Sequence, residues 1–346
     1  MKKISVIGAT GYAGAELLRL LFMHPEAEVA AMTSESHAGK RIDEVYPHLL
    51  GCYDDVLQTM EEAKPILQSS DAVFIALPHG HAMAVGKALQ EAGSHAKIID
   101  LGADYRFSDT AVYESWYKVA HTHKDAKRVY GLAEIYRDSI RTASIIGNAG
   151  CYTTASILAL APLAKYHLID MGSVIIDAKS GVSGAGRSPK LGTHFPETYD
   201  NFKAYGLPTH RHTPEIEQAL TELSGEACVL SFSPHLLPMS RGILATCYAT
   251  LKDGVDEARV EEAYQSMYGG EYFIRLRGKS FPETKYVRGS NFCDIGWRPD
   301  ARTKRIVVMS VIDNLVKGAA GQAIQNFNIV CGFDERTGLD CIPVYP

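Results

Sequence analysis

The sequence lacks the features of several protein classes. Its formal net charge is −5, so no positive excess predicts binding to nucleic acid or to an anionic membrane. The seven cysteines are scattered and form no Cys-x-x-Cys pair, which argues against a disulfide framework and a zinc site. The amino-terminal apolar stretch ISVIGA is too short for a signal sequence or a membrane span. We therefore expect a reduced, cytoplasmic protein that acts on a small molecule.

The length of 346 residues exceeds the usual size of one hydrophobic core, which predicts two domains. We expect an α/β protein in which residues 1–150, completed by the C-terminal helix 314–346, form a Rossmann-type dinucleotide-binding domain. Residues 151–313 are expected to form an α+β catalytic and oligomerisation domain with a largely antiparallel sheet. A symmetric homo-oligomer, either dimer or tetramer, is the expected assembly.

The amino-terminal segment has the pattern of a βαβ unit. An apolar run at 4–7 is followed by a glycine-rich turn, a helical segment and a second strand at 29–32. Further alternation predicts a strand at 71–77, a helix at 81–92 and a strand at 97–102. This order predicts a parallel sheet.

The glycine spacing in this turn is Gly8-x-x-Gly11-x-x-Gly14, which departs from the standard G-x-G-x-x-G. We expect Gly8 to permit the tight turn, Gly11 to let a pyrophosphate approach the backbone, and Gly14 to allow close packing of helix on strand. The alternative, a turn without a ligand, is opposed by the strand-turn-helix context. The other cofactor-binding residues predicted in this turn are Thr10, Tyr12 and Ala13.

The segment after the second strand bears on the choice of cofactor. An NAD enzyme places an acidic side chain here against the ribose 2′-hydroxyl, whereas hydroxyl groups and two cations at 33–41 suit a 2′-phosphate. Glu35 could serve as that acid, so the residues favour NADP without excluding NAD. Ser34 and Ser36 are the predicted contacts, and Pro78, after the 71–77 strand, is expected to line the same site.

Cys151 begins a predicted helix at 151–166, directly after Gly150. The unpaired N–H groups and positive dipole end of a first helical turn stabilise a thiolate, and they can also stabilise an oxyanion. A buried structural cysteine is the alternative. The glycine and the helix start favour the nucleophile.

The rest of the second half contains strand patterns at 172–179 and 229–251, in YFIRLR and in RIVVMSVI, and a last helix at 313–324. A glycine loop at 180–187 is expected to be mobile. His210 and His212 precede a helix that Pro214 begins and Thr213 is expected to cap, and either histidine could carry protons. A metal role for this His-x-His lacks a nearby third ligand.

Arg106 follows the 97–102 strand and is a candidate clamp for a phosphate or carboxylate, although a lone arginine more often forms a surface ion pair. Arg187 and Arg211 are similar candidates. A dinucleotide fold combined with an activated cysteine has one economical explanation. The cysteine attacks an acyl phosphate, phosphate leaves, and hydride from NADPH reduces the thioester to an aldehyde.

Taken together, these motifs resemble the N-acetyl-gamma-glutamyl-phosphate reductases of arginine biosynthesis, a branch of the aspartate-semialdehyde dehydrogenase superfamily. The segments that carry the resemblance are GATGYAGAEL (8–17), ALPHG (76–80), IDLGADYRF (99–107), GNAGCYTTA (147–155), SGVSGAGR (180–187), HRHTPEI (210–216), SRGILAT (240–246) and DNLVKGAAGQAIQ (313–325). The family usually has proline where this chain has Ala149 and Thr153.

The resemblance implies that Cys151 is the covalent nucleophile and that one histidine of the His210/His212 pair is the acid/base. It implies further cofactor contacts at Gly181, Ser183, Gly184 and Asn314, and substrate contacts at Arg106, Asn148, Arg187 and Arg211. A related reductase of lysine biosynthesis, acting on an N-modified aminoadipyl phosphate, stays open as an alternative. So does a non-catalytic NADP-binding redox sensor that uses the same thiol.

Overall fold

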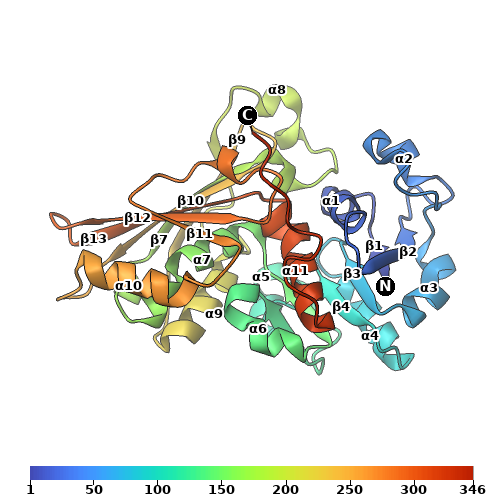
Figure 1. Cartoon of the computed structure of the whole chain (residues 1–346), viewed down its shortest axis with the longest axis horizontal. Helices are drawn as coiled ribbons and strands as arrows, with labels where there is room; N and C mark the ends of the chain where they lie inside the picture. The colour runs from blue at the N-terminus through green and yellow to red at the C-terminus, as the bar shows by residue number, and fades with distance from the viewer. Residues whose placement is uncertain (346) are drawn as a thin grey trace. The chain divides into compact units, whose positions relative to one another are not determined.

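A computed structural model describes residues 1–345 of the chain, which divides into two compact units (Figure 1). The first unit comprises residues 1–150 and 319–340. The second comprises residues 151–318 and the chain from Cys341 onward. The segment 314–346, expected to belong to the first domain as a whole, is therefore shared between the two units. Across residues 1–345, no helix combines the length and apolar character that crossing a bilayer requires.

The sheet of the first unit is parallel throughout, as the alternation of strands and helices predicts. Its strand order is β2-β1-β3-β4-β6-β5. Because β1 lies between β2 and β3, the carboxyl ends of these three strands meet at one edge, where open α/β sheets bind ligands. The strands are β1 (Lys2–Ile7), β2 (Ala27–Thr33), β3 (Ala72–Ile75), β4 (Lys97–Asp100), β5 (Arg128–Gly131) and β6 (Ile145–Asn148).

Helices cover both faces of this sheet. Helix α3 packs against β1 and β2, whereas α11, from the C-terminal part of the chain, packs against α1, α6 and β4 (Figure 1, red). The helices are α1 (Tyr12–Leu21), α2 (Ile42–Val45), α3 (Met60–Ser69), α4 (Ala82–Glu91), α5 (Thr110–Tyr117), α6 (Ala133–Arg141) and α11 (Gly321–Cys331), with a 3-10 turn at Pro47–Leu49.

The last helix differs from the one expected at 313–324. A π-helical turn spans Val316–Ala320, and α11 begins only at Gly321 and continues to Cys331. The carboxylate of Asp313 accepts the backbone N–H groups of Leu315 and Val316, so this aspartate precedes the helical segment as its cap. The prediction placed the start too early because Asp313 has the residue type of a cap, not of a helix interior.

The second unit contains a seven-stranded mixed sheet in the order β11-β12-β13-β10-β7-β9-β8. It is largely antiparallel, as expected, but β7 pairs with β9 and β11 with β12 in parallel. The strands are β7 (Ile175–Gly181), β8 (Lys203–Ala204), β9 (Ser231–Leu237), β10 (Ile243–Thr250), β11 (Ile274–Gly278), β12 (Cys293–Asp300) and β13 (Arg305–Ile312).

Helix α7 (Cys151–Lys165) is the central helix of the second unit. Its side chains from Tyr152 to Ala164 are all buried, and it packs against α9, α10, β10 and β13. Burial on all sides agrees with its nearly uninterrupted apolar sequence. The other helices are α8 (Phe195–Thr198), α9 (Thr213–Ser224) and α10 (Glu257–Tyr268), with 3-10 turns at Met171–Ser173, Val182–Ala185, Leu191–Thr193 and Thr284–Tyr286.

Candidate functional site

The glycine turn of the first unit has the geometry expected for a phosphate cradle. Gly8 has a φ of +80°, and a Cβ there would lie 2.5 Å from the carbonyl oxygen of Ala76, so the position requires glycine. A Cβ at Gly14 would collide with the carbonyl oxygen of Gly8 and lie 2.8 Å from Cα of Ala9. By contrast, a Cβ at Gly11 would meet nothing closer than 3.6 Å. Gly11, at the N-cap of α1, therefore has open space beside its backbone.

Side chains at the end of β2 and beyond it support this turn. The hydroxyl groups of Thr10 and Ser34 lie 2.7 Å apart, and the N–H of Gly8 donates to Oγ1 of Thr33 over 3.4 Å. Tyr46 donates its hydroxyl hydrogen to the carbonyl oxygen of Thr10. The predicted residues of the first βα turn and of the β2 end are thus brought together at one edge of the sheet.

Glu35, the residue that blurred the choice between NAD and NADP, is engaged elsewhere. Its Oε1 accepts the backbone N–H of Met60 over 2.9 Å, at the start of α3. Arg41 makes a two-point contact with the carboxylate of Asp43, at 3.1 Å and 2.9 Å. Ser36 is exposed, and its hydroxyl lies 2.8 Å from Nδ1 of His37. Lys40, in the same segment after β2, is also exposed.

The turn after β3, which contains Pro78, is held by an aspartate that the sequence analysis did not single out. Asp104 is buried and accepts the N–H groups of Gly80 and Ala82 over 2.8 Å and 2.9 Å. It lies in the predicted GADYRF segment, where its neighbour Arg106 drew attention instead. Burial, together with the charge of Asp104, raises the pKa of nearby Asp100 to about 7.

Arg106 and Asn148 lie in the interior of the first unit. Arg106 is 5% exposed and donates from Nε to the carbonyl oxygen of Asn148 over 2.7 Å and from Nη2 to that of Leu101 over 2.9 Å. The alternative of a surface ion pair is therefore wrong. Asn148 donates to the carbonyl oxygen of Ala319 over 3.1 Å and accepts from Nδ2 of Asn326 over 2.9 Å. Both side chains hold the turn that leads from β6 to residue 150.

Cys151 is the first residue of α7, as predicted, and its side chain is partly exposed. Gly318, in the π-helical turn, lies against it. A Cβ at Gly318 would approach Cβ of Cys151 to 2.7 Å and its Cα to 3.0 Å. No local pattern points to Gly318, because the contact joins residues far apart in the chain. The backbone at Gly318 therefore forms one wall beside the Cys151 side chain, and the close packing fixes the position of this wall.

Both candidate histidines lie at the start of α7. The ring of Tyr152, the residue after Cys151, contacts the rings of His210 and His212, with centroids 5.7 Å and 6.0 Å apart. Tyr205 and Phe232 enclose His210 further, at 5.4 Å and 5.2 Å. The second unit thus brings together the predicted nucleophile and both predicted proton carriers.

The two histidines differ in their surroundings. Burial, aided by the charge of Arg211, lowers the pKa of His210 from 6.5 to about 4. His210 Nδ1 also accepts the backbone N–H of His212 over 3.1 Å. Thr213, the expected cap, is instead the first residue of α9, and His212 takes the N-cap position. The helix therefore begins one residue earlier than expected.

Two tyrosines line the same region. The hydroxyl of Tyr205 donates to that of Tyr152 over 3.2 Å, and Tyr152 donates to the carbonyl oxygen of His235 over 2.8 Å. Burial raises the pKa of both phenols, so they remain protonated donors at neutral pH. The pKa of Tyr205 is raised further by the proximity of Cys151. A negative charge on the Cys151 thiol therefore disfavours ionisation of the Tyr205 hydroxyl.

A buried hydrogen bond joins α7 to α9. Thr153, on the first turn of α7, donates from Oγ1 to Oε1 of the fully buried Glu215 over 2.8 Å. Proline, which the resemblance leads one to expect at residue 153, could not make this contact. The departure from the family pattern thus supplies a polar link of its own between α7 and α9.

The side chain of Asn314 links two turns of the second unit by hydrogen bonds. Asn314 accepts the N–H of Gly242 over 2.8 Å and donates to Oγ of Ser183 over 2.9 Å. Ser183 lies in the 3-10 turn after Gly181, and its backbone N–H donates to the carbonyl oxygen of Ser240. The expected mobile loop at 180–187 is therefore a hydrogen-bonded turn in its first half. Gly184 follows Ser183 in this turn, whereas Arg187 beyond it is exposed, as is Arg211.

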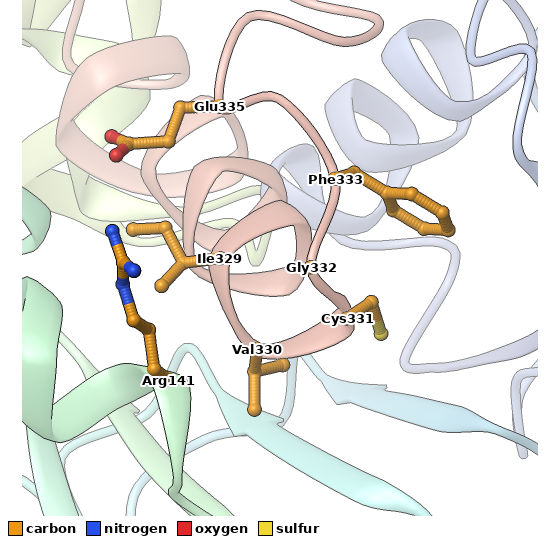
Figure 2. Close-up of a pocket in the computed structure, with 7 residues that line it drawn as sticks. All are labelled: Arg141, Ile329, Val330, Cys331, Gly332, Phe333 and Glu335. Carbon is orange, nitrogen blue, oxygen red and sulfur yellow. The ribbon is translucent and has the colours of Figure 1, made fainter.

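A cavity of about 520 Å³ lies beside the C-terminal end of α11 in the first unit (Figure 2). Figure 2 shows the Arg141 and Glu335 side chains on the same side of the helix, whereas Phe333 points away. The cavity is lined by Arg141, Ile329, Val330, Cys331, Gly332, Phe333 and Glu335. None of these was predicted as a site residue.

Comparisons with known proteins match both units to one family. Residues 3–143 match the semialdehyde dehydrogenase NAD binding domain, and residues 151–314 match the semialdehyde dehydrogenase dimerisation domain. The chain is 54% identical to an N-acetyl-gamma-glutamyl-phosphate reductase of Pelotomaculum thermopropionicum, over 99% of each chain. It is 50% identical to the enzyme of the same name from Desulforamulus reducens, over 100% of each.

Solved structures show the same fold at low sequence identity. Aspartate semialdehyde dehydrogenase II of Vibrio cholerae, complexed with ASA, is 17% identical with a TM-score of 0.73, over 96% of this chain and 98% of that one. The aspartate semialdehyde dehydrogenase of Candida albicans, with NADP, is 18% identical with a TM-score of 0.70, over 96% and 99%.

Proposed function

The chain belongs to the N-acetyl-gamma-glutamyl-phosphate reductases, within the semialdehyde dehydrogenase family, and we propose the reaction that it catalyses in arginine biosynthesis. N-acetyl-L-glutamyl 5-phosphate is reduced by NADPH to N-acetyl-L-glutamate 5-semialdehyde, with release of phosphate. The observation that carries the proposal is Cys151 at the start of α7, with both histidines gathered around Tyr152, in a chain of this family.

The cofactor of this oxidoreductase family is a nicotinamide dinucleotide, and the first unit has the residues to hold one. Gly11 leaves space for a pyrophosphate, and the α1 N-terminus offers N–H groups to it. We assign NADP because Glu35 is bound to Met60, while Ser36 and Lys40 are exposed at the same edge. When bound, the reduced cofactor supplies hydride.

Cys151 acts as the nucleophile. Its thiolate attacks the acyl carbon of the substrate, the C–O bond to the phosphate breaks, and a thioester remains on the sulfur. The first-turn N–H groups of α7 stabilise both the thiolate and the oxyanion of the tetrahedral intermediate. A bound reduced cofactor would supply hydride to the thioester carbon, and the resulting thiohemiacetal oxyanion would take a proton from the enzyme. Return of that proton to the enzyme then expels the thiolate and releases the aldehyde.

His212 is the residue we assign to this proton transfer. A proton carrier works best with a pKa near the operating pH, whereas His210, with a pKa of about 4, is neutral there. Because Nδ1 of His210 accepts a hydrogen bond, its proton resides on Nε2. His210 thus serves as a neutral donor that also fixes the His212 backbone. Two neutral phenols, Tyr152 and Tyr205, complete the surroundings.

The exposed Arg187 and Arg211 are the arginines we assign to the anionic groups of the substrate. Arg106 and Asn148 are assigned a different task, because their side chains hold the turn before Cys151 from within the first unit. They thus fix the approach of the chain to the nucleophile. Because the second unit matches a dimerisation domain, we also propose a homo-oligomer.

The deciding experiment is phosphate-dependent reduction of NADP with N-acetyl-glutamate semialdehyde, run in parallel with the aminoadipate and aspartate semialdehydes. Preference for the first aldehyde supports the proposal, whereas preference for another retains the mechanism and changes the substrate. Each reaction is repeated with NAD to test the cofactor assignment. NADP binding without turnover of any aldehyde would favour the redox sensor instead.

Cys151→Ser is the matched test of the covalent step. It should lower turnover by about a thousandfold or more, because the alcohol is a far weaker nucleophile, while NADP affinity stays nearly unchanged. Cys341→Ser, which changes another partly exposed cysteine, is the control. Substantial turnover of the Cys151→Ser variant would rule out the thioester mechanism.

A further inference from the structure

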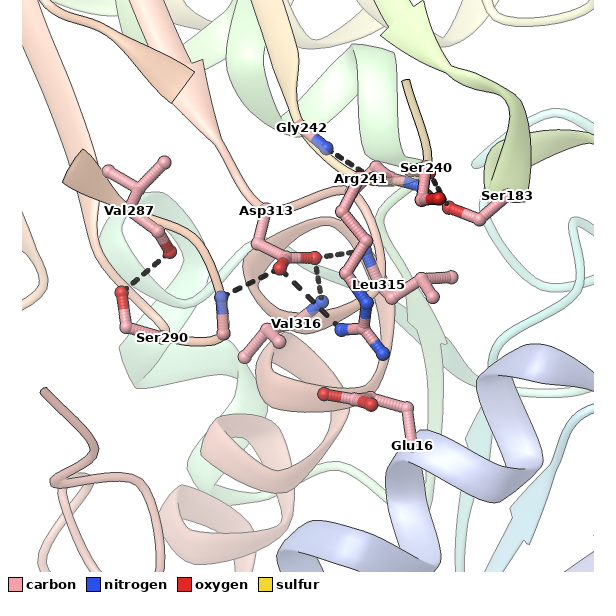
Figure 3. Close-up of polar contacts among 12 residues, drawn as sticks. Glu16, Ser183, Ser240, Arg241, Gly242, Val287, Ser290, Asp313, Leu315 and Val316 are labelled. Atoms are coloured by element: carbon pink, nitrogen blue, oxygen red, sulfur yellow. Dashed lines mark hydrogen bonds and ion pairs between the residues drawn. The ribbon is translucent and has the colours of Figure 1, made fainter. Parts of the chain in front are cut away.

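Asp313 is a fully buried carboxylate directly after β13, and the activity proposed above assigns it no role. Figure 3 shows it at the centre of a polar cluster. Its Oδ1 accepts the backbone N–H groups of Leu315 and Val316 over 2.8 Å and 3.3 Å. Its Oδ2 accepts the N–H of Gly289 over 2.8 Å and lies 3.5 Å from Nη1 of Arg241. One carboxylate thus joins three separate segments of the second unit.

The segment that Asp313 caps contains two residues of the candidate site. Asn314 follows it directly and ties the Gly242 turn to Ser183. Gly318 donates its N–H to the carbonyl oxygen of Asp313 over 3.0 Å, and it is the glycine packed against Cys151. Both the side chain and the backbone of Asp313 therefore fix the path of the chain between these two positions.

This path has the irregular geometry often found at functional sites. Residues Val316–Ala320 form a π-helical turn, which leaves the regular helical hydrogen-bond pattern. Such a turn needs an external partner for its first N–H groups, and the carboxylate of Asp313 supplies that partner. The other oxygen of the carboxylate faces Arg241 and the N–H of Gly289, which lie in two other turns.

We propose that Asp313 is a positioning residue for the reaction, which sets the π-helical turn so that Gly318 forms the wall beside Cys151 and Asn314 holds the Ser183 turn. The side-chain contacts of Asp313 are with backbone N–H groups and Arg241, and none of them is with the thiol. Asp313 acts through the residues that follow it. The inference rests on the proposed function for its kinetic part, whereas the placement of Gly318 against Cys151 can be tested without turnover.

The sharpest variant is Asp313→Asn, which keeps the shape of the side chain. An amide has one acceptor oxygen and one donor group, so its NH₂ must face N–H donors on one side, either Leu315 and Val316 or Gly289 and Arg241. The cluster then loses one of its two halves. Asp256→Asn is the matched control, because Asp256 also caps a helix of the second unit, by accepting the N–H of Arg259.

Three measurements separate positioning from mere stability. We expect Asp313→Asn to lower kcat by about tenfold or more, with a change in KM for the aldehyde of less than about threefold, because misplacement of reacting groups acts on the chemical step. The rate at which iodoacetamide alkylates Cys151 should change by about threefold or more, since its wall has moved. Asp256→Asn should leave both rates within about twofold of the parent, because a distant cap affects stability alone.

The proposal is overturned if folded Asp313→Asn keeps both its kcat and its alkylation rate within the range of the Asp256→Asn control. If Asp313→Asn does not fold, Arg241→Gln decides, because it weakens the cluster from outside the π-helical turn. Unchanged kcat and alkylation in that variant would overturn the proposal. If the parent protein oxidises none of the aldehydes, the proposed function has failed, and the alkylation rates still test the placement of Gly318.

Discussion

The backbone N–H of His212 donates a hydrogen bond to Nδ1 of His210, over 3.1 Å. The two histidines are therefore not equivalent. A ring nitrogen that accepts a hydrogen bond carries no proton, so His210 is held as the Nε2–H tautomer, and burial keeps it neutral. His212 contributes its backbone N–H to this contact, and its ring is the one that we propose for proton transfer.

Substitution of each histidine by asparagine should therefore give unequal results. His212→Asn removes the proposed proton carrier and should lower kcat by about 10²–10⁴-fold, the range for general acid–base catalysis. His210→Asn places an amide oxygen near the former Nδ1 and should cost much less. Steady-state kinetics of the two variants at pH 7.5 test this. Small and equal losses would remove the acid/base assignment, and a larger loss in His210→Asn would reverse the two roles.

The low pKa of His210 also predicts a dependence of stability on pH. The folded state favours the neutral form of His210. The contribution of this histidine to the free energy of unfolding is therefore fully present above pH 6.5 and is lost as the pH falls toward 4. His210→Gln should therefore flatten the plot of unfolding free energy against pH between 6.5 and 4, by at most about 1.4 kcal/mol per pH unit.

Urea denaturation at several pH values measures this slope, with the exposed His95→Gln variant as reference for the loss of one histidine. An identical slope in the two variants would contradict the buried, neutral state of His210. The histidines His24, His121 and His123, whose pKa values burial also lowers, remain in both variants and contribute equally to both curves.

The sequence predicted those features that depend on neighbouring residues. The parallel sheet follows from alternating strands and helices, and the helix at Cys151 follows from an apolar run behind a glycine. Strand β12 was not identified, because Gly296 interrupts its pattern. That glycine is required by packing, since a Cβ there would lie 2.6 Å from the carbonyl oxygen of Ser280.

The features that sequence reasoning missed join residues far apart in the chain. Gly318 against Cys151 and Glu35 on the N–H of Met60 have no local pattern. Arg106 shows the same difficulty, since an arginine after a strand has one appearance in the sequence whether it meets a substrate or backbone carbonyl groups. Only the packing of distant segments distinguishes these cases.

The glycine turn offers a test of cofactor binding that leaves folding intact. Gly11→Ala should keep nearly the parent stability, because its Cβ meets nothing within 3.6 Å and its φ of −78° suits alanine. The same methyl should obstruct a pyrophosphate and weaken NADP binding by about tenfold or more, as steric overlap with a ligand costs over ~1.4 kcal/mol. Gly14→Ala should instead lower stability, since its Cβ collides with Gly8.

Titration of NADP by fluorescence and thermal unfolding without cofactor, carried out on both variants, measure these effects. If Gly11→Ala binds NADP as tightly as the parent does, the pyrophosphate does not bind at this turn. A loss of unfolding temperature in Gly11→Ala equal to that in Gly14→Ala would show that the space beside Gly11 is not open.

The contact between Gly318 and Cys151 gives the last prediction. Gly318→Ala inserts a methyl group 2.7 Å from Cβ of Cys151, so either the thiol or the π-helical turn must shift. Overpacking of this kind lowers the unfolding free energy by about 1–3 kcal/mol. A displacement of the nucleophile by about 1 Å lowers kcat by about a hundredfold, because the attack geometry is lost. Gly270→Ala is the control, since its Cβ would meet nothing within 4 Å. Parent-like kcat in folded Gly318→Ala would show that the position of this wall does not govern the reactivity of Cys151.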